Sequence, residues 1–124
     1  MARIVLIIAA VVEFVFRGLP AFFGTEAVAK LFGLEYIPGA LVYVHPFGAL
    51  MLVFGVMFFI ASKDPVKNRL IMDFGILRYA LGIASYGVTL LTLGTIATFW
   101  WLHLVVDVVL LVLLVVSRPK TGAA

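Results

Sequence analysis

The sequence predicts an all-α integral membrane protein, a bundle of four transmembrane helices built from a single domain over residues 1–124. Hydrophobic residues make up 65% of the chain, charged residues make up 12%, and the mean hydropathy is +1.27. A soluble domain of this length cannot bury so much apolar surface. The apolar residues also form four runs of about 20 residues, the length that crosses a bilayer.

The first run covers residues 4–20 and contains a break near its end, because Gly18 and Pro20 either kink the helix or end it early. It resembles the start of a secretory signal, but no small-residue cleavage site follows. We therefore expect a retained first span. Behind it, Thr25 is a suitable N-cap and Gly33 a suitable C-terminal residue for a short amphipathic helix lying in the membrane interface.

The other three spans are expected at residues 40–62, 68–93 and 97–117. Only Gly94 and Thr95 interrupt the last two, and so short a link makes these helices antiparallel neighbours. Most basic residues gather at one end of the spans, and the positive-inside rule places that end and both termini in the cytoplasm. These residues are Arg3, Lys63, Lys67, Arg69, Arg118 and Lys120.

The same distribution argues against a nucleic-acid partner, because the net charge of +3 comes from the ends of apolar runs rather than from a basic stripe. Absence of cysteine excludes disulfides, thiolate metal sites and thiol redox chemistry. Any redox role would need a bound cofactor or a quinone.

Two spans carry glycines seven residues apart, Gly48 with Gly55 and Gly75 with Gly82. Residues at this spacing return to nearly the same helix face, and small residues let helices approach closely in lipid. We expect both faces to pack against neighbouring helices.

Three spans each carry an ionisable residue at one depth. Glu13, Arg78 and Asp107 lie ten residues from the cytoplasmic end of their own spans, or about 15 Å at a rise of about 1.5 Å per residue. A charge in mid-membrane costs about 2.5–3.5 kcal/mol on insertion scales, so each needs a partner or a purpose. The sharpest expectation is an ion pair between Arg78 and Asp107 on neighbouring spans.

A second polar layer is expected one turn nearer the outside. Arg17 follows Glu13, and His103 precedes Asp107, by four residues each, so each pair shares a helix face. His45 lies within a few residues' rise of this layer. The predicted polar core therefore contains Glu13, Arg17, His45, Arg78, His103 and Asp107.

Other polar residues are expected to play lesser roles. Asp73 and Arg69 are spaced for a surface ion pair. Tyr79 and Tyr86 are interpreted as interfacial or packing aromatics. The polar core itself has two readings: a closed network that fixes helix register, or a ligand site to which the two histidines add proton exchange.

If the core is a ligand site, the first hypothesis is a quinone-like amphipathic ligand, with histidine and arginine donors at a ring carbonyl. A b-type haem held by His45 and His103 is an alternative. A metal site is less favoured, because the arginines repel cations. A proton-coupled transporter that uses Glu13 is the competing class, although Arg17 would neutralise that acid.

Residues from Pro38 to Tyr86 carry the layout Pro-Gly, Gly48, Gly55, a Ser-Lys-Asp-Pro turn and Arg78. This layout resembles small bacterial four-helix membrane proteins of the DoxX-like kind. The resemblance implies a membrane bundle in the bacterial inner membrane, with some members attached to quinone-linked redox systems or serving as accessory subunits. We therefore expect a binding or accessory subunit of a larger membrane complex or a homo-oligomer, rather than an independent enzyme.

Overall fold

The computed structural model describes residues 1–120, and these residues form helices joined by short connections. The first span is built from α1 (Ala2–Val11), a π-helical segment η1 (Val12–Gly18) and α2 (Leu19–Phe23). A short α3 (Glu26–Leu31) and a 3₁₀ turn η2 (Pro38–Ala40) lead to α4 (Leu41–Lys63). The chain continues through α5 (Arg69–Leu93) and α6 (Thr98–Ser117).

Four helical stretches of the described residues are long and apolar enough to cross a membrane: 2–23, 38–63, 69–93 and 98–117. Their outward surfaces are covered by large apolar side chains such as Ile8, Phe59, Leu81 and Val112. In water this surface would be unfavourable, whereas lipid is a suitable solvent for it. Four apolar helices of this length suggest a multi-pass membrane protein.

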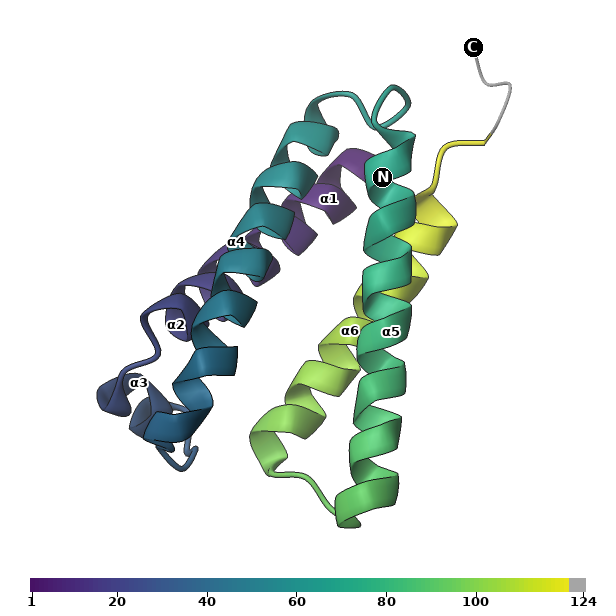
Figure 1. The fold of residues 1–124 in the computed structure, drawn as a ribbon. Coiled ribbons are helices and arrows are strands. Elements are labelled where there is room, and N and C mark those ends of the chain that lie inside the picture. Colours follow the sequence, from purple (N-terminus) through teal and green to yellow (C-terminus); the bar gives the residue numbers. More distant parts are fainter. Residues whose placement is uncertain (121–124) are drawn as a thin grey trace.

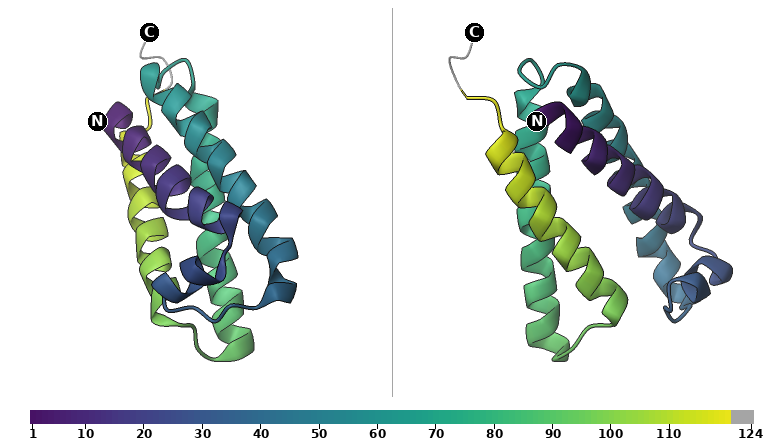
Figure 2. Two further views of the ribbon diagram at one scale, coloured as in Figure 1. Left: turned by 90° about the vertical axis from the view of Figure 1, so that its left-hand side faces the viewer. Right: turned by 180° about the vertical axis from the view of Figure 1, so that it is seen from behind.

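The helices form two hairpins. The first span packs along α4, and α5 packs along α6 (Figure 1). The hairpins meet at the end of the bundle that holds the start of α1 and the α4–α5 turn, and they diverge toward α3 (Figure 2). We call these two ends the terminal end and the α3 end.

The apolar core lies in the terminal half, where all four spans contribute fully buried side chains such as Leu6, Phe58, Met72 and Leu114. The glycine faces pack as predicted. A methyl group on Gly48 would collide with the backbone of Phe22, and one on Gly75 would lie 2.6 Å from the Phe58 ring. Glycine at these positions therefore lets the helices approach closely.

Pro20 neither ends the first span nor breaks it, since the helix continues to Phe23. Proline has no N–H and its ring clashes with the carbonyl four residues earlier. The wider π-helical turn η1, directly before α2, accommodates both effects. Gly24, with a φ of +45°, then ends α2 in a left-handed conformation.

The short helix expected after Thr25 is α3, and the Thr25 side chain accepts a 3.2 Å hydrogen bond from the Val28 amide. A Glu26–Lys30 ion pair of 2.9 Å lies on its exposed face. The N-cap prediction is confirmed. The helix folds against the α3 end of the bundle (Figure 1).

Candidate functional site

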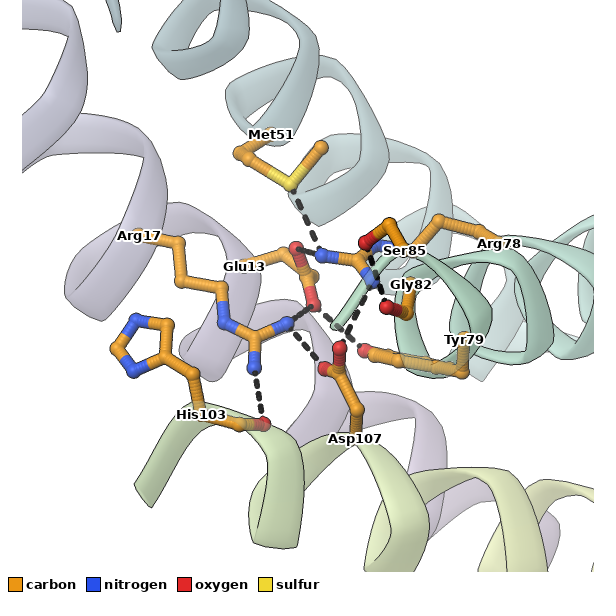
Figure 3. A network of polar contacts seen from close by, with 9 residues as sticks. All are labelled: Glu13, Arg17, Met51, Arg78, Tyr79, Gly82, Ser85, His103 and Asp107. Carbon is orange, nitrogen blue, oxygen red and sulfur yellow. Dashed lines mark hydrogen bonds and ion pairs between the residues drawn. The ribbon is translucent and has the colours of Figure 1, made fainter. Parts of the chain in front are cut away.

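Four charged side chains from three spans form a closed ring of ion pairs (Figure 3). Arg17 Nη1 lies 2.9 Å from Glu13 Oε1 and 2.6 Å from Asp107 Oδ1. Arg78 Nη2 lies 3.2 Å from Glu13 Oε2, and Arg78 Nη1 lies 3.6 Å from Asp107 Oδ2. We call these four residues the ionic ring. The expected Arg78–Asp107 pair is confirmed, and the closer contacts of both residues are to Glu13 and Arg17.

Positive and negative charges alternate around the ring, so its net charge is zero. Glu13 is fully buried, while Asp107 is 2% and Arg17 is 4% exposed. Burial of a charge is unfavourable unless the charge is paired and hydrogen-bonded, and each member here contacts two opposite charges. The ring therefore compensates internally for its own desolvation.

The local structure of the first span positions half of the ring. Glu13 and Arg17 both lie in η1, and their spacing of four residues brings the guanidinium onto the carboxylate. π-Helical turns inside α-helices are rare and occur frequently at functional sites. Here the turn directly precedes the helix that carries Pro20, and it contains Glu13 and Arg17.

A glycine on α5 makes room for the ring. A methyl group on Gly82 would lie 2.8 Å from Asp107 Oδ2 and 3.1 Å from Arg78 Nη1. Any larger residue there would occupy the space in which the two side chains meet. Gly82 thus leaves the space that the Arg78 and Asp107 side chains occupy, in addition to its role in helix packing.

Tyr79 is a ring partner that the sequence did not reveal. Its hydroxyl donates a 2.8 Å hydrogen bond to Glu13 Oε1, and its side chain is fully buried. The interpretation of Tyr79 as only a packing aromatic is therefore incomplete. An ionised carboxylate can accept about four hydrogen bonds. This capacity indicates that Glu13 could accept a hydrogen bond from a donor other than the two arginines.

His103 reaches the ring through its backbone rather than its side chain. Its carbonyl accepts a 3.3 Å hydrogen bond from Arg17 Nη2, while the imidazole points away from the carboxylates (Figure 3). The imidazole packs on two aromatic rings of α6, with centroids 4.3 Å from Phe99 and 5.7 Å from Trp100. The His103 side chain therefore makes no ion pair with the ring, and its place in the polar core as a ligand-binding group stays a prediction.

The His45 side chain makes no ion pair with the ring either. Its side chain is exposed, and its ring lies against Gly24 at the end of α2. Residue counting predicts how deep His45 lies along α4 but not which face of α4 it occupies. His45 lies three residues before Gly48 and therefore near the face of α4 that packs on α2. The alternative of a b-type haem held by His45 and His103 stays a prediction.

Asp73 pairs with Arg118, and Arg69, its expected partner, also interacts electrostatically with its carboxylate. Arg118 donates from Nε at 2.5 Å and from Nη2 at 2.8 Å to the two carboxylate oxygens. The planar guanidinium favours this bidentate geometry, and Arg118 reaches Asp73 of α5 from the end of α6. The hydrogen bonds raise the pKa of Arg118, which lies outside the spans. This pair joins α5 to the end of α6, away from the ionic ring.

A cavity of about 470 Å³ lies at the α3 end, between the first span, α3, α4 and the start of α6. Its walls are mostly apolar and aromatic, with Phe16, Phe47 and Trp100 among them, and Arg17 and His103 lie at its inner side. We call it the α3-side cavity. Its volume falls in the range of about 300–1,000 Å³ that is usual for small-molecule sites.

A second cavity of about 280 Å³ lies between α4 and α5 and is lined by Arg78 and Asp107 of the ring. We call it the ring cavity. Arg17, Phe47 and His103 line both cavities, so the two cavities adjoin each other. The wall that the two cavities share carries two polar side chains, Arg17 and His103.

Within residues 1–120, no group of three or more His, Asp or Glu side chains is arranged to hold a metal ion. Glu13 and Asp107, the carboxylates of the polar core, are each bridged by both arginines. A cation at this place would meet two positive charges. The ring therefore favours neutral or weakly polar partners.

The interpretation of the site rests on the geometry of these residues. In comparisons with known proteins, no family model, curated protein or solved structure matches the chain.

Proposed function

We propose that this protein is a small membrane binding subunit that holds an amphipathic, quinone-like ligand beside its polar core. The observation that carries the proposal is the shared wall of Arg17 and His103, which brings hydrogen-bonding groups to the inner side of a largely apolar cavity. An apolar pocket with a few convergent polar groups is the usual form of a small-molecule site. The same role is what the DoxX-like layout of Pro38 to Tyr86 implies.

The His103 imidazole is the group offered to such a ligand. Arg17 is largely occupied, because Nη1 contacts two carboxylates and Nη2 donates to a carbonyl. The imidazole instead packs on Phe99 and Trp100 at the cavity wall. An imidazole can donate or accept a hydrogen bond at a ligand carbonyl or hydroxyl. Flanking aromatic rings would stack on a planar ligand ring.

A proton-coupled transporter is the less favoured function. Such a role needs a carboxylate that releases its counter-ion when substrate or proton arrives. Glu13 contacts Arg17 at 2.9 Å, Arg78 at 3.2 Å and the Tyr79 hydroxyl at 2.8 Å. An incoming substrate or proton would have to compete with these three donors for the carboxylate.

The test is purification in mild detergent without added cofactors, followed by an absorption spectrum and mass spectrometry of released small molecules. We expect a lipid-soluble carbonyl compound to co-purify, to be lost from His103→Ala and to be retained by His45→Ala. His45 is the matched control because it is an exposed histidine that lines neither cavity.

Two results would overturn the proposal. One is a compound retained equally by both histidine variants, which would place the ligand elsewhere. The other is a protein free of small molecules whose companion is another membrane polypeptide. That result would support docking to a larger membrane complex, with the ionic ring as scaffold.

A further inference from the structure

The ring cavity opens sideways, toward the space that lipid occupies around a spanning bundle. Its wall includes Leu50 and Leu81, which are 51% and 61% exposed on the outer surface of α4 and α5. Both lie in the middle of helices long enough to span a membrane. A lipid-soluble molecule could therefore reach the ring without leaving the bilayer.

Arg78 is the ring member with donors left to offer. Its side chain is 12% exposed, whereas those of Arg17, Glu13 and Asp107 are at most 3% exposed. Nη2 donates to Glu13 Oε2 and to the Met51 sulfur. Nη1 lies 3.6 Å from Asp107 Oδ2, beyond hydrogen-bond distance, and Nε has no acceptor among residues 1–120.

A guanidinium carries five N–H donors, and Arg78 donates hydrogen bonds to only two acceptors among the described residues. Tyr86 lines the same cavity, and no hydrogen bond joins its hydroxyl to another of the described residues. Two donors thus border one space. Because the ring is already neutral, a charged ligand would leave an uncompensated charge in a low dielectric. A neutral oxygen acceptor satisfies the donors without this penalty.

We infer that the ring cavity binds a carbonyl oxygen of a neutral, lipid-soluble ligand, through Arg78 and Tyr86, and that the ligand enters from the bilayer between α4 and α5. The inference rests on the proposed function, since the wall shared by the two cavities would contact one and the same ligand. It adds the chemical class of the recognised group and the route of entry.

The test uses the full chain in lipid nanodiscs and a benzoquinone with a decyl tail as the probe. Quenching of tryptophan fluorescence measures the dissociation constant and the association rate, because Trp100 lines the α3-side cavity. Loss of one hydrogen bond predicts about fivefold weaker binding for Tyr86→Phe. Tyr43→Phe, at a residue that is 78% exposed and lines neither cavity, should bind as the unmodified protein does.

The route is tested by Leu81→Phe, which adds bulk at the lateral opening. We expect association to slow severalfold. Leu77→Phe, one turn earlier on α5, is the control, since Leu77 is 52% exposed and lies outside the cavity. Neither leucine belongs to the buried core, and the Tyr86 hydroxyl has no partner to lose, so these variants keep the ring and the fold.

The outcomes separate the inference from the proposed function. Normal binding by Tyr86→Phe and normal association by Leu81→Phe would overturn the inference while the α3-side site stands. Weakening by Tyr36→Phe alone would do the same, because Tyr36 lines only the α3-side cavity. If the quinone does not bind the unmodified protein, both the inference and the quinone-like function fail.

Discussion

The Tyr79 hydroxyl donates a 2.8 Å hydrogen bond to the Glu13 carboxylate and so joins the two helical hairpins in the middle of the bundle. Four further contacts make the same connection: Arg78 with Glu13 and with the Met51 sulfur, and Arg17 with Asp107 and with the His103 carbonyl. The remaining ring contacts lie within a hairpin. The ionic ring is thus the main polar link between the hairpins.

Replacing Tyr79 with phenylalanine should destabilise the protein by about 1–3 kcal/mol, the usual effect of losing a hydrogen bond to a buried charged group. The ring of the side chain stays, so its packing is kept. Thermal or denaturant unfolding in detergent measures the effect, with Tyr43→Phe at an exposed site as the control. Equal stability of the two variants would show that the Tyr79 hydroxyl contributes nothing.

Two ion pairs in this chain have the same length and spacing but opposite environments. Glu13–Arg17 and Glu26–Lys30 are both 2.9 Å pairs four residues apart, and only the first is buried. Double-mutant cycles with glutamine should give a coupling of about 1–3 kcal/mol for the buried pair. The exposed pair should give no more than about 0.5 kcal/mol. Similar couplings would mean that burial does not strengthen the ring.

Gly48→Ala should lower stability by about 1–3 kcal/mol, because the added methyl group meets the backbone of Phe22, which cannot rotate away. Gly87→Ala is the matched control on α5, where a methyl group meets nothing within 4 Å. That change should leave stability equal or raise it by up to about 1 kcal/mol through helix propensity. The unfolding midpoint should therefore fall for Gly48→Ala and stay equal or rise for Gly87→Ala. A stable Gly48→Ala protein would contradict the close approach of α2 and α4.

The orientation in the membrane has a direct test, because the chain contains no cysteine. Val66→Cys places a thiol in the α4–α5 turn, and Thr95→Cys places one in the α5–α6 link. A membrane-impermeant maleimide applied from outside should label the second and not the first. The reverse pattern would place both termini outside.

Much of the fold followed from the sequence, because lipid imposes simple length and polarity rules on a spanning helix. Four apolar runs, the capped helix after Thr25 and the glycine faces are all observed. The course of the first span was left open, since Pro20 signals a disturbance but not its form. The wider turn that resolves it depends on tertiary packing.

The candidate site was predicted in part. Depth along a helix is readable from residue counts, and it correctly brought Glu13, Arg78 and Asp107 together. The angle of each residue around its helix is not readable in this way, which is why the exposed side chain of His45 was not predicted. Tyr79 was missed because a tyrosine in an apolar span has the same pattern whether it packs or donates.

The pairing within the ionic ring also bears on how the chain is assembled. Each hairpin carries one acid and one base that already contact each other, Glu13 with Arg17 and Arg78 with Asp107. Each hairpin can therefore enter the bilayer as an electrically balanced unit during synthesis, before the other is present. As the two halves associate, each residue keeps this partner and gains a second one from the other hairpin, in agreement with a two-stage pathway of insertion followed by helix association.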